Sequence, residues 1–158
     1  ATATVQAALG GASASLSIDL SNTYLDWAYR NFVLNGIAGE RHRLLRADCL
    51  DWLRSAGHEH AGAFDLIFLD PPTFSNSKKM TDTLDIQRDH PGLIRASMEL
   101  LAPGGTLVFS NNFRRFRLDA EIAEAFGIEN VSTRTLDPDF RGDERIHHCW
   151  LIRHRTSA

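Results

Sequence analysis

The sequence predicts an α/β fold built on a mainly parallel sheet. Short apolar runs that suit buried strands alternate with longer segments in which apolar residues recur at helical spacing, and this alternation is typical of βαβ units. The run 66–69 is the clearest strand, because it is too short for a helix and its unbroken apolar character suits a strand covered on both faces. It ends at Asp70, and Pro71-Pro72 cannot continue the strand because proline has no N–H to donate.

The other elements follow from the same two patterns. Ser21 suits the N-cap of the helix after it, and Pro91 suits the first turn of a helix, where N–H groups lack partners. The last two strands have no helix between them, so the final strand is expected to be antiparallel. The expected helices span 4–9, 23–34, 50–55, 91–101 and 118–126, and the expected strands span 13–19, 43–47, 66–69, 106–110, 129–135 and 149–153.

Length and charge indicate one domain without a global affinity for nucleic acid. A chain of 158 residues with 43% apolar content can bury its own core, and we expect a single domain over 1–158. The formal charge of −3 means that any contact with RNA must come from local patches. Cys49 and Cys149 have neither metal-ligand spacing nor the density of a disulfide framework, so the sequence favours a reducing cytoplasm. No stretch approaches the roughly 18 consecutive apolar residues of a membrane span.

Polar residues follow four of the predicted strands. Crossovers of one hand bring the carboxyl ends of parallel strands to one edge of the sheet, and open α/β sheets bind ligands there. A single polar residue is ordinary where a strand meets solvent, but a repeated pattern favours a ligand site. The residues are Asp19, Asp48, Asp70 and the group Ser110-Asn111-Asn112.

The turn after the central strand has the chemistry of a site for a planar, nitrogen-rich substrate. Asp70 and the free carbonyls of Pro71-Pro72 are acceptors, and Phe74 can offer a flat face to a base. The alternative is that Asp-Pro-Pro only ends the strand, since both residue types are common in turns.

These residues resemble those of the Rossmann-like, S-adenosylmethionine-dependent methyltransferases of class I. In that family an acidic residue after the second strand holds the ribose hydroxyls of the cofactor, and Asp19 matches it. Another acidic residue, after the third strand, lies near the adenine amino group, and Asp48 matches it. The resemblance therefore implies a cofactor site that includes Asp19, Leu20, Asp48, Cys49 and Asp70.

The motif at the central strand resembles the same family. A D/N-P-P-aromatic motif after the fourth strand lies beside the methyl donor and the target base. Asp70, Pro71, Pro72 and Phe74 are similar, with the aromatic residue one place late, and the resemblance implies that they form the catalytic site.

Longer stretches are similar to the C-terminal methyltransferase domain of the bifunctional 23S rRNA guanine methyltransferases of bacteria, the RlmKL family. They are FDLIFLDPPTFSNSKKM (64–80), DIQRDH (85–90), FSNN (109–112) and IHHCWLI (146–152). The resemblance covers nearly the whole chain. It implies N7 methylation of a guanine in 23S rRNA, with further domains fused on the N-terminal side.

The family's first strand and glycine loop have no counterpart in this chain. They should precede Thr4, and Gly10-Gly11 cannot replace the loop because they follow a helix, whereas a cofactor-binding glycine turn follows a strand. We therefore expect an N-terminally truncated methyltransferase domain whose sheet lacks its central strand. Cofactor affinity is then expected to depend on a preceding segment.

Guanine N7 is a lone pair that carries no proton, so its methylation needs no strong general base. Asp70 is therefore expected to position the substrate as an acceptor, for example of the guanine amino group. Methylation at C5 of a pyrimidine instead needs a cysteine nucleophile. Related enzymes carry it after the fifth strand, where this chain has Ser110-Asn111-Asn112, and neither Cys49 nor Cys149 is expected to be well placed.

RNA contacts are expected from three basic segments. Arginines that alternate with phenylalanines, as in 113–117, suit phosphate pairing and base stacking on a single-stranded or flipped guanine. The alternative is a solvated loop whose phenylalanines are buried. The expected RNA-binding residues are Lys78, Lys79, Arg88, His90, Arg114, Arg115 and Arg117.

No metal site is predicted from the run His147-His148-Cys149. Side chains alternate between the two faces of a strand, so His147 and Cys149 should separate from His148 and Trp150.

Other functions remain open at this point. One is methylation of an exocyclic amine (N2 or N6) of a nucleic acid, which is the commoner association of Asp-Pro-Pro-aromatic. Another is a catalytically silent RNA-binding module, because the first strand is absent. A nicotinamide-dependent oxidoreductase is disfavoured, since the chain has no glycine-rich turn after a strand.

Overall fold

The computed structural model describes residues 2–75, 83–140 and 142–155. Lys78 and Lys79 therefore lie outside the described residues. The chain forms two compact units, Ala1–Trp52 and Leu53–Ala158, which we call the first and the second unit.

The first unit is a parallel strand pair with two helices. Its elements are α1 (Thr2–Leu9), β1 (Ser15–Asp19), α2 (Asn22–Leu34), β2 (His42–Arg46) and the start of α3 (Cys49–His60). β1 and β2 run parallel with Asp19 opposite Arg46. Ser21 caps α2 as predicted, because its hydroxyl accepts a hydrogen bond from the Tyr24 N–H at 3.4 Å.

The second unit contains a sheet with the strand order β3-β6-β8-β7. β3 and β6 are parallel, and β8 is antiparallel to both of its neighbours, which confirms the prediction for the final strand. The strands are β3 (Phe64–Leu69), β6 (Leu101–Asn111), β7 (Gly127–Asn130) and β8 (His148–Arg153). The helices are α4 (Ile86–Leu100), α5 (Ala120–Ala125) and α6 (Ser132–Thr135). Two 3-10 turns span Pro138–Phe140 and Glu144–Ile146. A separate antiparallel pair is formed by β4 (Phe74–Ser75) and β5 (Leu84–Asp85).

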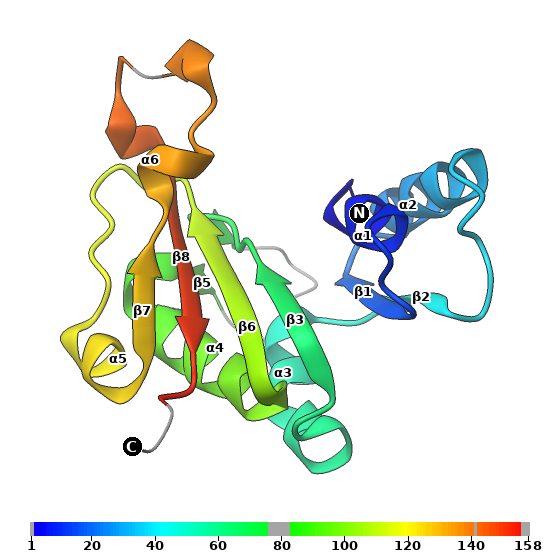
Figure 1. Cartoon of the computed structure of the whole chain (residues 1–158), viewed down its shortest axis with the longest axis horizontal. Coiled ribbons are helices and arrows are strands. Elements are labelled where there is room, and N and C mark those ends of the chain that lie inside the picture. The colour runs from blue at the N-terminus through cyan, green and yellow to red at the C-terminus, as the bar shows by residue number, and fades with distance from the viewer. Residues whose placement is uncertain (1, 76–82, 141, 156–158) are drawn as a thin grey trace. The chain divides into compact units, whose positions relative to one another are not determined.

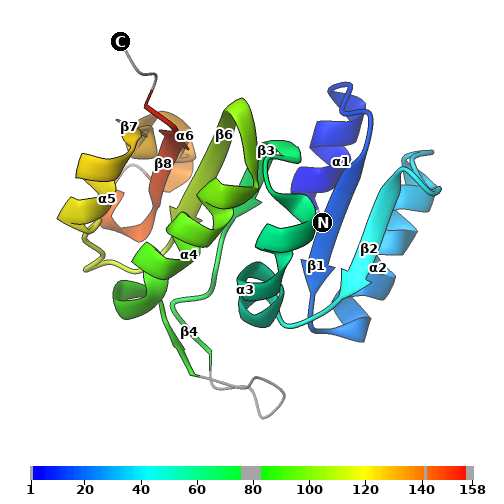
Figure 2. The same ribbon diagram turned by 90° about the horizontal axis from the view of Figure 1, so that it is seen from below.

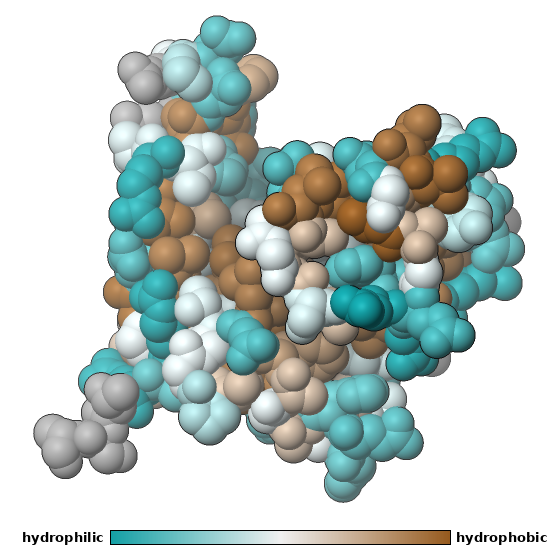
Figure 3. Space-filling view, turned by 45° about the vertical axis from the view of Figure 1, so that its right-hand side comes forward, coloured by the Kyte–Doolittle hydropathy of each residue, from teal (hydrophilic) through white to brown (hydrophobic). Residues whose placement is uncertain are grey.

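The two faces of this sheet differ in what covers them. Figures 1 and 2 show α4 and α5 on one face, where Ile94 and Ile122 are fully buried together with Phe109 of β6. On the opposite face, Leu66 and Phe68 of β3 are 55% and 53% exposed, and hydrophobic residues reach the surface there (Figure 3). Within the described residues, β3 pairs only with β6 and β1 only with β2, so each of these two strands keeps an open edge.

β6 begins earlier than the sequence predicted. The Pro103-Gly104-Gly105 stop lies inside the strand, because a bulge shifts the register between Phe64 and Leu66 of β3. A Cβ on Gly105 would lie only 3.0 Å from the Phe64 carbonyl oxygen, so the close approach of the two backbones requires glycine.

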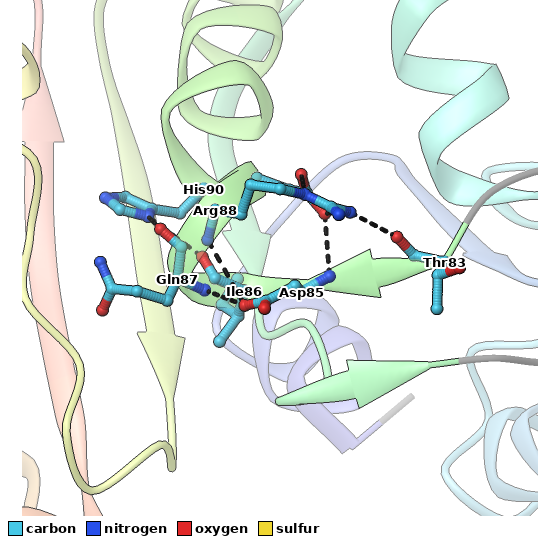
Figure 4. A network of polar contacts seen from close by, with 7 residues as sticks. Thr83, Asp85, Ile86, Gln87, Arg88 and His90 are labelled. Atoms are coloured by element: carbon cyan, nitrogen blue, oxygen red, sulfur yellow. Dashed lines mark hydrogen bonds and ion pairs between the residues drawn. The ribbon is translucent and has the colours of Figure 1, made fainter.

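α4 also begins before the predicted start at Pro91. Asp85 is its N-cap, and its carboxylate accepts from the Gln87 and Arg88 N–H groups at 2.9 and 3.4 Å (Figure 4). Pro91 lies inside the helix and cannot donate to the carbonyl four residues back. The His90 Nδ1 lies 3.0 Å from that carbonyl, on Gln87, and equally close to the Ile86 carbonyl, so the histidine side chain supplies the missing donor.

The predicted strand 129–135 is only partly correct. β7 ends at Asn130, whose Oδ1 accepts from the Ser132 N–H at 2.9 Å, and α6 follows. This side-chain turn competes with the strand that the β-branched residues favour.

His90 should make the stability of the chain depend on pH. The ring is 1% exposed, and since Nδ1 donates to α4, Nε2 accepts from the Asp119 N–H at 3.0 Å, so the neutral form is required. Burial lowers the pKa of His90 below the usual 6.5. As the pH falls below about 6.5, the unfolded chain takes up a proton on this histidine that the folded chain does not. The stabilisation of the fold by neutral His90 is therefore fully present above that pH and is lost on acidification.

The measurement is urea unfolding at about pH 8, 7, 6 and 5. His90→Leu should cost about 2 kcal/mol near pH 8, because it leaves the Asp119 N–H unpaired, and its stability should fall less on acidification than that of the wild type. His58→Ala, which removes an exposed histidine, should retain the wild-type slope. An unchanged slope in His90→Leu would show that His90 is not the group responsible.

Candidate functional site

Asp70 and Ser110 meet at the carboxyl ends of β3 and β6. Leu69 lies opposite Phe109 in the parallel register, which makes the next residue of each strand a neighbour. The Ser110 hydroxyl donates to Asp70 Oδ1 at 2.8 Å. Within the described residues Asp70 Oδ2 has no hydrogen-bond partner, so one carboxylate oxygen is held and the other is available. The predicted grouping of these two strand ends is therefore confirmed.

A cavity of about 560 Å³ opens beside this pair in the second unit. Its volume is in the range of small-molecule and nucleobase sites. Pro71 and Pro72 form part of its wall, as the turn after the central strand was expected to do. The lining residues are Phe68, Asp70, Pro71, Pro72, Val108, Ser110, Asn111, Asn112, Thr135, His147 and Cys149.

The far wall comes from α6 and the start of β8, and sequence reasoning missed it. Cys149 lies opposite Ser110 in the antiparallel register. Thr135 Oγ1 lies 2.8 Å from His147 Nε2. The missed signal was the predicted direction of the last strand, because an antiparallel strand begins at the edge where its parallel neighbours end.

Cys149 does line this cavity, which corrects the expectation that neither cysteine is well placed. It is only 4% exposed, and burial raises the pKa of its thiol; a hydrogen bond with Thr135 opposes this shift, and the nearby Asp70 charge adds to it. A thiol kept in its protonated form is a poor nucleophile. The chemical argument against C5 methylation therefore holds for a reason other than distance.

The alternation of side chains along β8 is confirmed. His147 and Cys149 face the cavity, while His148 stacks on Trp150 with ring centroids 5.7 Å apart. Among the described residues, no three histidine, cysteine, aspartate or glutamate side chains form a group that could hold a metal ion.

The asparagines after Ser110 divide between two roles. Asn111 is 2% exposed, and its Oδ1 accepts from the Phe113 N–H at 3.1 Å, so this side chain secures the following loop. Asn112 Oδ1 accepts from the Thr73 hydroxyl at 2.9 Å and joins the two strand ends. Phe74, the aromatic residue of the motif, is 64% exposed and can stack against a ligand.

In the first unit, Asp19 and Asp48 end neighbouring parallel strands as predicted. Asp19 Oδ1 accepts from the Ser21 N–H at 2.7 Å, and Asp48 Oδ1 accepts from the Leu50 N–H at 2.8 Å. Asp48 Oδ2 is buried and has no hydrogen-bond partner within the described residues. A buried acceptor of this kind can accept a hydrogen bond from a ligand or from a water molecule.

Cys49 stands beside these carboxylates. Its Sγ donates to the Ile18 carbonyl at 3.6 Å. Burial of the sulfur, followed by the charges of Asp19 and Asp48, raises the pKa of the thiol to about 11 although the residue is exposed overall. Cys49 is therefore a neutral neighbour of the carboxylates and does not act as a nucleophile at neutral pH.

Comparison with known proteins identifies the family. Residues 1–142 match the model of a family described as S-adenosylmethionine-dependent methyltransferase. The chain belongs to this family. The chain is 65% identical over 154 residues to the ribosomal RNA large subunit methyltransferase K/L of Chromohalobacter salexigens and 58% identical to that of Saccharophagus degradans. These alignments cover 98% of the chain but only 20% of each relative's length.

A solved structure agrees with this assignment. SMU.776, named a methyltransferase and determined with S-adenosylhomocysteine, superposes with a TM-score of 0.77 at 25% identity over 94% of this chain and 41% of that protein. The Rossmann-like methyltransferase fold predicted from the sequence is confirmed. None of the helices in the described part of the chain is long and apolar enough to cross a membrane.

The carboxylates of the first unit fit the methyltransferase cofactor. S-Adenosylmethionine brings two ribose hydroxyls and an adenine amino group, which are hydrogen-bond donors, and the acceptors left open are on Asp19 and Asp48. Leu20 directly follows Asp19, and its carbonyl accepts a hydrogen bond from Arg46 Nε at 3.4 Å. The donor set of the cofactor thus matches the acceptors that these residues present.

Two residues that were predicted to bind RNA are instead engaged within the protein. His90 is buried with both ring nitrogens bonded, which corrects its assignment to an RNA surface, because burial takes its ring away from solvent. The Arg88 guanidinium binds the Asp89 carboxylate at 2.6 and 2.8 Å and the Thr83 carbonyl at 2.7 Å, so it braces the start of α4 (Figure 4).

The segment 113–117, which we call the arginine loop, carries its arginines on the surface. Arg114, Arg115 and Arg117 are exposed, and Arg114 pairs with Asp143 at 3.2 Å. Phe116 between them is 6% exposed and packs edge-on against His90 at 4.7 Å. The alternative of a buried phenylalanine is therefore correct for this residue, and its burial fixes the loop that presents the arginines.

Asp19 is expected to bind the cofactor. Asp19→Asn keeps an acceptor for the Ser21 N–H but removes the charge and one acceptor, so the affinity for S-adenosylhomocysteine should fall about 10-fold. Calorimetric titration measures it, in this chain and in a version extended upstream by one strand and its loop. Asp26→Asn, on the exposed side of α2, is the charge-matched control. An unchanged affinity in Asp19→Asn would remove the ribose assignment.

Proposed function

We propose that this chain is the S-adenosylmethionine-dependent domain that methylates a guanine of 23S rRNA at N7, acting in the cytoplasm. The 65% identity to a ribosomal RNA large subunit methyltransferase K/L supports the rRNA substrate. Because the chain spans a fifth of the length of such relatives, we also propose that fused domains on its N-terminal side complete the enzyme.

The residues of the second unit supply positioning for this reaction. When bound, S-adenosylmethionine supplies an electrophilic methyl group on a sulfonium. Guanine N7 has no proton to lose, so the protein needs to orient the base and exclude water. Asp70, steadied by Ser110, accepts from a donor on the base, Pro71 and Pro72 shape the turn, and Phe74 provides a face for stacking.

Methylation of an exocyclic amine is the second candidate. The observation that favours it is the available Asp70 Oδ2 beside a rigid Pro-Pro turn, because an amine must lose a proton and an acceptor could hold it. A silent RNA-binding module is the third candidate. Cofactor binding by neither the chain nor its extended version would support that module.

RNA would lie against the arginine loop. The loop is fixed by Phe116 and by reciprocal bonds in which Gln87 Nε2 donates to the Arg117 carbonyl and Gln87 Oε1 accepts from the Arg117 N–H, each at 2.9 Å. A fixed backbone with exposed cationic side chains suits phosphate contacts. We also assign Lys78 and Lys79 to this interface from their sequence, and a smaller part to Arg88, whose guanidinium is already bound.

Asp70 should affect turnover far more than cofactor affinity. Asp70→Asn keeps an acceptor for Ser110 but weakens the acceptor for the base, so kcat should fall about 10- to 100-fold while the affinity for S-adenosylhomocysteine changes less than about 2-fold. Asp65→Asn, an exposed position on the same strand, controls for charge. Nucleoside analysis of the RNA product identifies the methylated atom, and methyl groups found only on an amine would replace N7 by the second candidate.

The arginine loop should determine the salt dependence of RNA binding. Replacing Arg114, Arg115 and Arg117 by alanine should reduce the slope of log K against log salt by about 2, since each lost phosphate contact on single-stranded RNA contributes about 0.7. The measurement is fluorescence anisotropy of a labelled rRNA fragment across a salt series.

The matched control removes three exposed arginines that pair with glutamates elsewhere, namely Arg95, Arg134 and Arg153. It has the same change of net charge and should keep the wild-type slope. Equal slopes in the two triple variants would take the loop out of the interface.

A further inference from the structure

Two polar groups of the cavity are held in the same way. The Ser110 hydroxyl holds Asp70 by Oδ1, at 2.8 Å, and the Thr135 hydroxyl holds His147 by Nε2, at 2.8 Å. In each case one atom is fixed by a hydroxyl and a second polar atom, Asp70 Oδ2 or His147 Nδ1, has no partner among the residues that the structure describes. All four residues line the same cavity.

The hydrogen bonds of Thr135 determine which tautomer of His147 is present. Thr135 Oγ1 lies 3.0 and 3.3 Å from the carbonyl oxygens of Val131 and Ser132, which can only accept, and we assign the one hydrogen of the hydroxyl to them. The contact with His147 is then donated by the ring Nε2–H. In a neutral imidazole the other nitrogen, Nδ1, carries the lone pair. His147, which lines the cavity, therefore carries an acceptor, as Asp70 does.

We propose that His147, positioned by Thr135, selects guanine by accepting a hydrogen bond from the base N1–H, while Asp70 accepts from the 2-amino group. This inference rests on the proposed function and names the residues that recognise its substrate. The recognised edge is the Watson–Crick edge of a base that is flipped out or single-stranded, as expected for enzymes that modify a base.

The acceptor pair fits only one of the four bases. Guanine presents two neighbouring donors, N1–H and the 2-amino group. Adenine and cytosine place a lone pair next to their amino group, and uracil places a carbonyl on each side of its single N–H. Each of these would bring an acceptor against His147 or Asp70, and two acceptors that face each other without a hydrogen between them repel. The selection is therefore by complementarity and by repulsion together.

The test compares guanine with 2-aminopurine at the target position of a short RNA substrate. 2-Aminopurine keeps the 2-amino group and N7, so both candidate methyl acceptors remain, but its N1 is a lone pair. The experiment uses whichever chain, given or extended, binds S-adenosylhomocysteine, and it measures transfer of a labelled methyl group. For the wild type, kcat/KM should favour guanine by about 100-fold or more.

His147→Leu should lower kcat/KM for guanine about 10- to 100-fold and leave the value for 2-aminopurine within about 3-fold, so that the discrimination collapses. Thr135→Val keeps the shape of the threonine side chain but removes the hydroxyl that holds the His147 ring, so it should reduce the discrimination in part. His147→Asn, which retains a short acceptor near the position of Nδ1, should restore part of it. A loss of protein stability alone would lower kcat/KM for both substrates by the same factor.

Two controls match these changes. His58→Ala removes an exposed histidine, and Thr106→Val removes a hydroxyl whose only described partner is Arg153, and both should keep the wild-type ratio. An unchanged ratio in His147→Leu overturns the assignment of His147 while the proposed function stands. A wild type that methylates neither RNA overturns the proposed function, and this inference with it.

Discussion

The site depends on the register of β6 with its two neighbours. Parallel pairing places Leu69 opposite Phe109, and antiparallel pairing places Cys149 opposite Ser110. Together they set Asp70, Ser110 and Cys149 in one row across the end of the sheet. A slip of one residue in either pairing would turn part of that row to the face covered by α4. The bulge beside Gly105 matters for this reason, because it accommodates the additional residues of β6 before the paired segment that carries the site begins.

The part of the site on β3 could be predicted from the sequence because its signals are local. An apolar run, a carboxylate and two prolines fix the end of a strand without reference to the rest of the chain. The wall formed by Thr135 and His147 could not be found in this way. The β-branched residues of 131–135 favour a strand, and the Asn130 side chain overrides them by bonding to the Ser132 N–H. A local hydrogen bond of this kind cannot be inferred from residue periodicity.

Burial separates the polar residues that we propose to bind RNA from those that stabilise the fold. His90 and the exposed arginines of the loop look equally suited to RNA in the sequence. In the structure, His90 replaces the donor that Pro91 lacks and accepts from the Asp119 N–H, so it connects α4 to the segment that carries the arginines. The start of α4 therefore acts as the support of the loop. The hydrogen bonds at the start of α4 position Arg114 and Arg117, although the residues that make them are not expected to contact RNA themselves.

The acceptor pair also bears on which atom of guanine receives the methyl group. A base held through N1–H and the 2-amino group has its Watson–Crick edge occupied, and N7 lies on the other side of the purine. N7 would then make no hydrogen bond to Asp70 or His147 and would keep its lone pair free for a methyl donor. The 2-amino group would instead be engaged in a hydrogen bond, with a nitrogen lone pair that is delocalised into the ring. Cys149 offers no competing route, because burial keeps its thiol protonated. Recognition of guanine by this edge therefore favours N7 over the exocyclic amine, and the two proposals support each other through the geometry of the base.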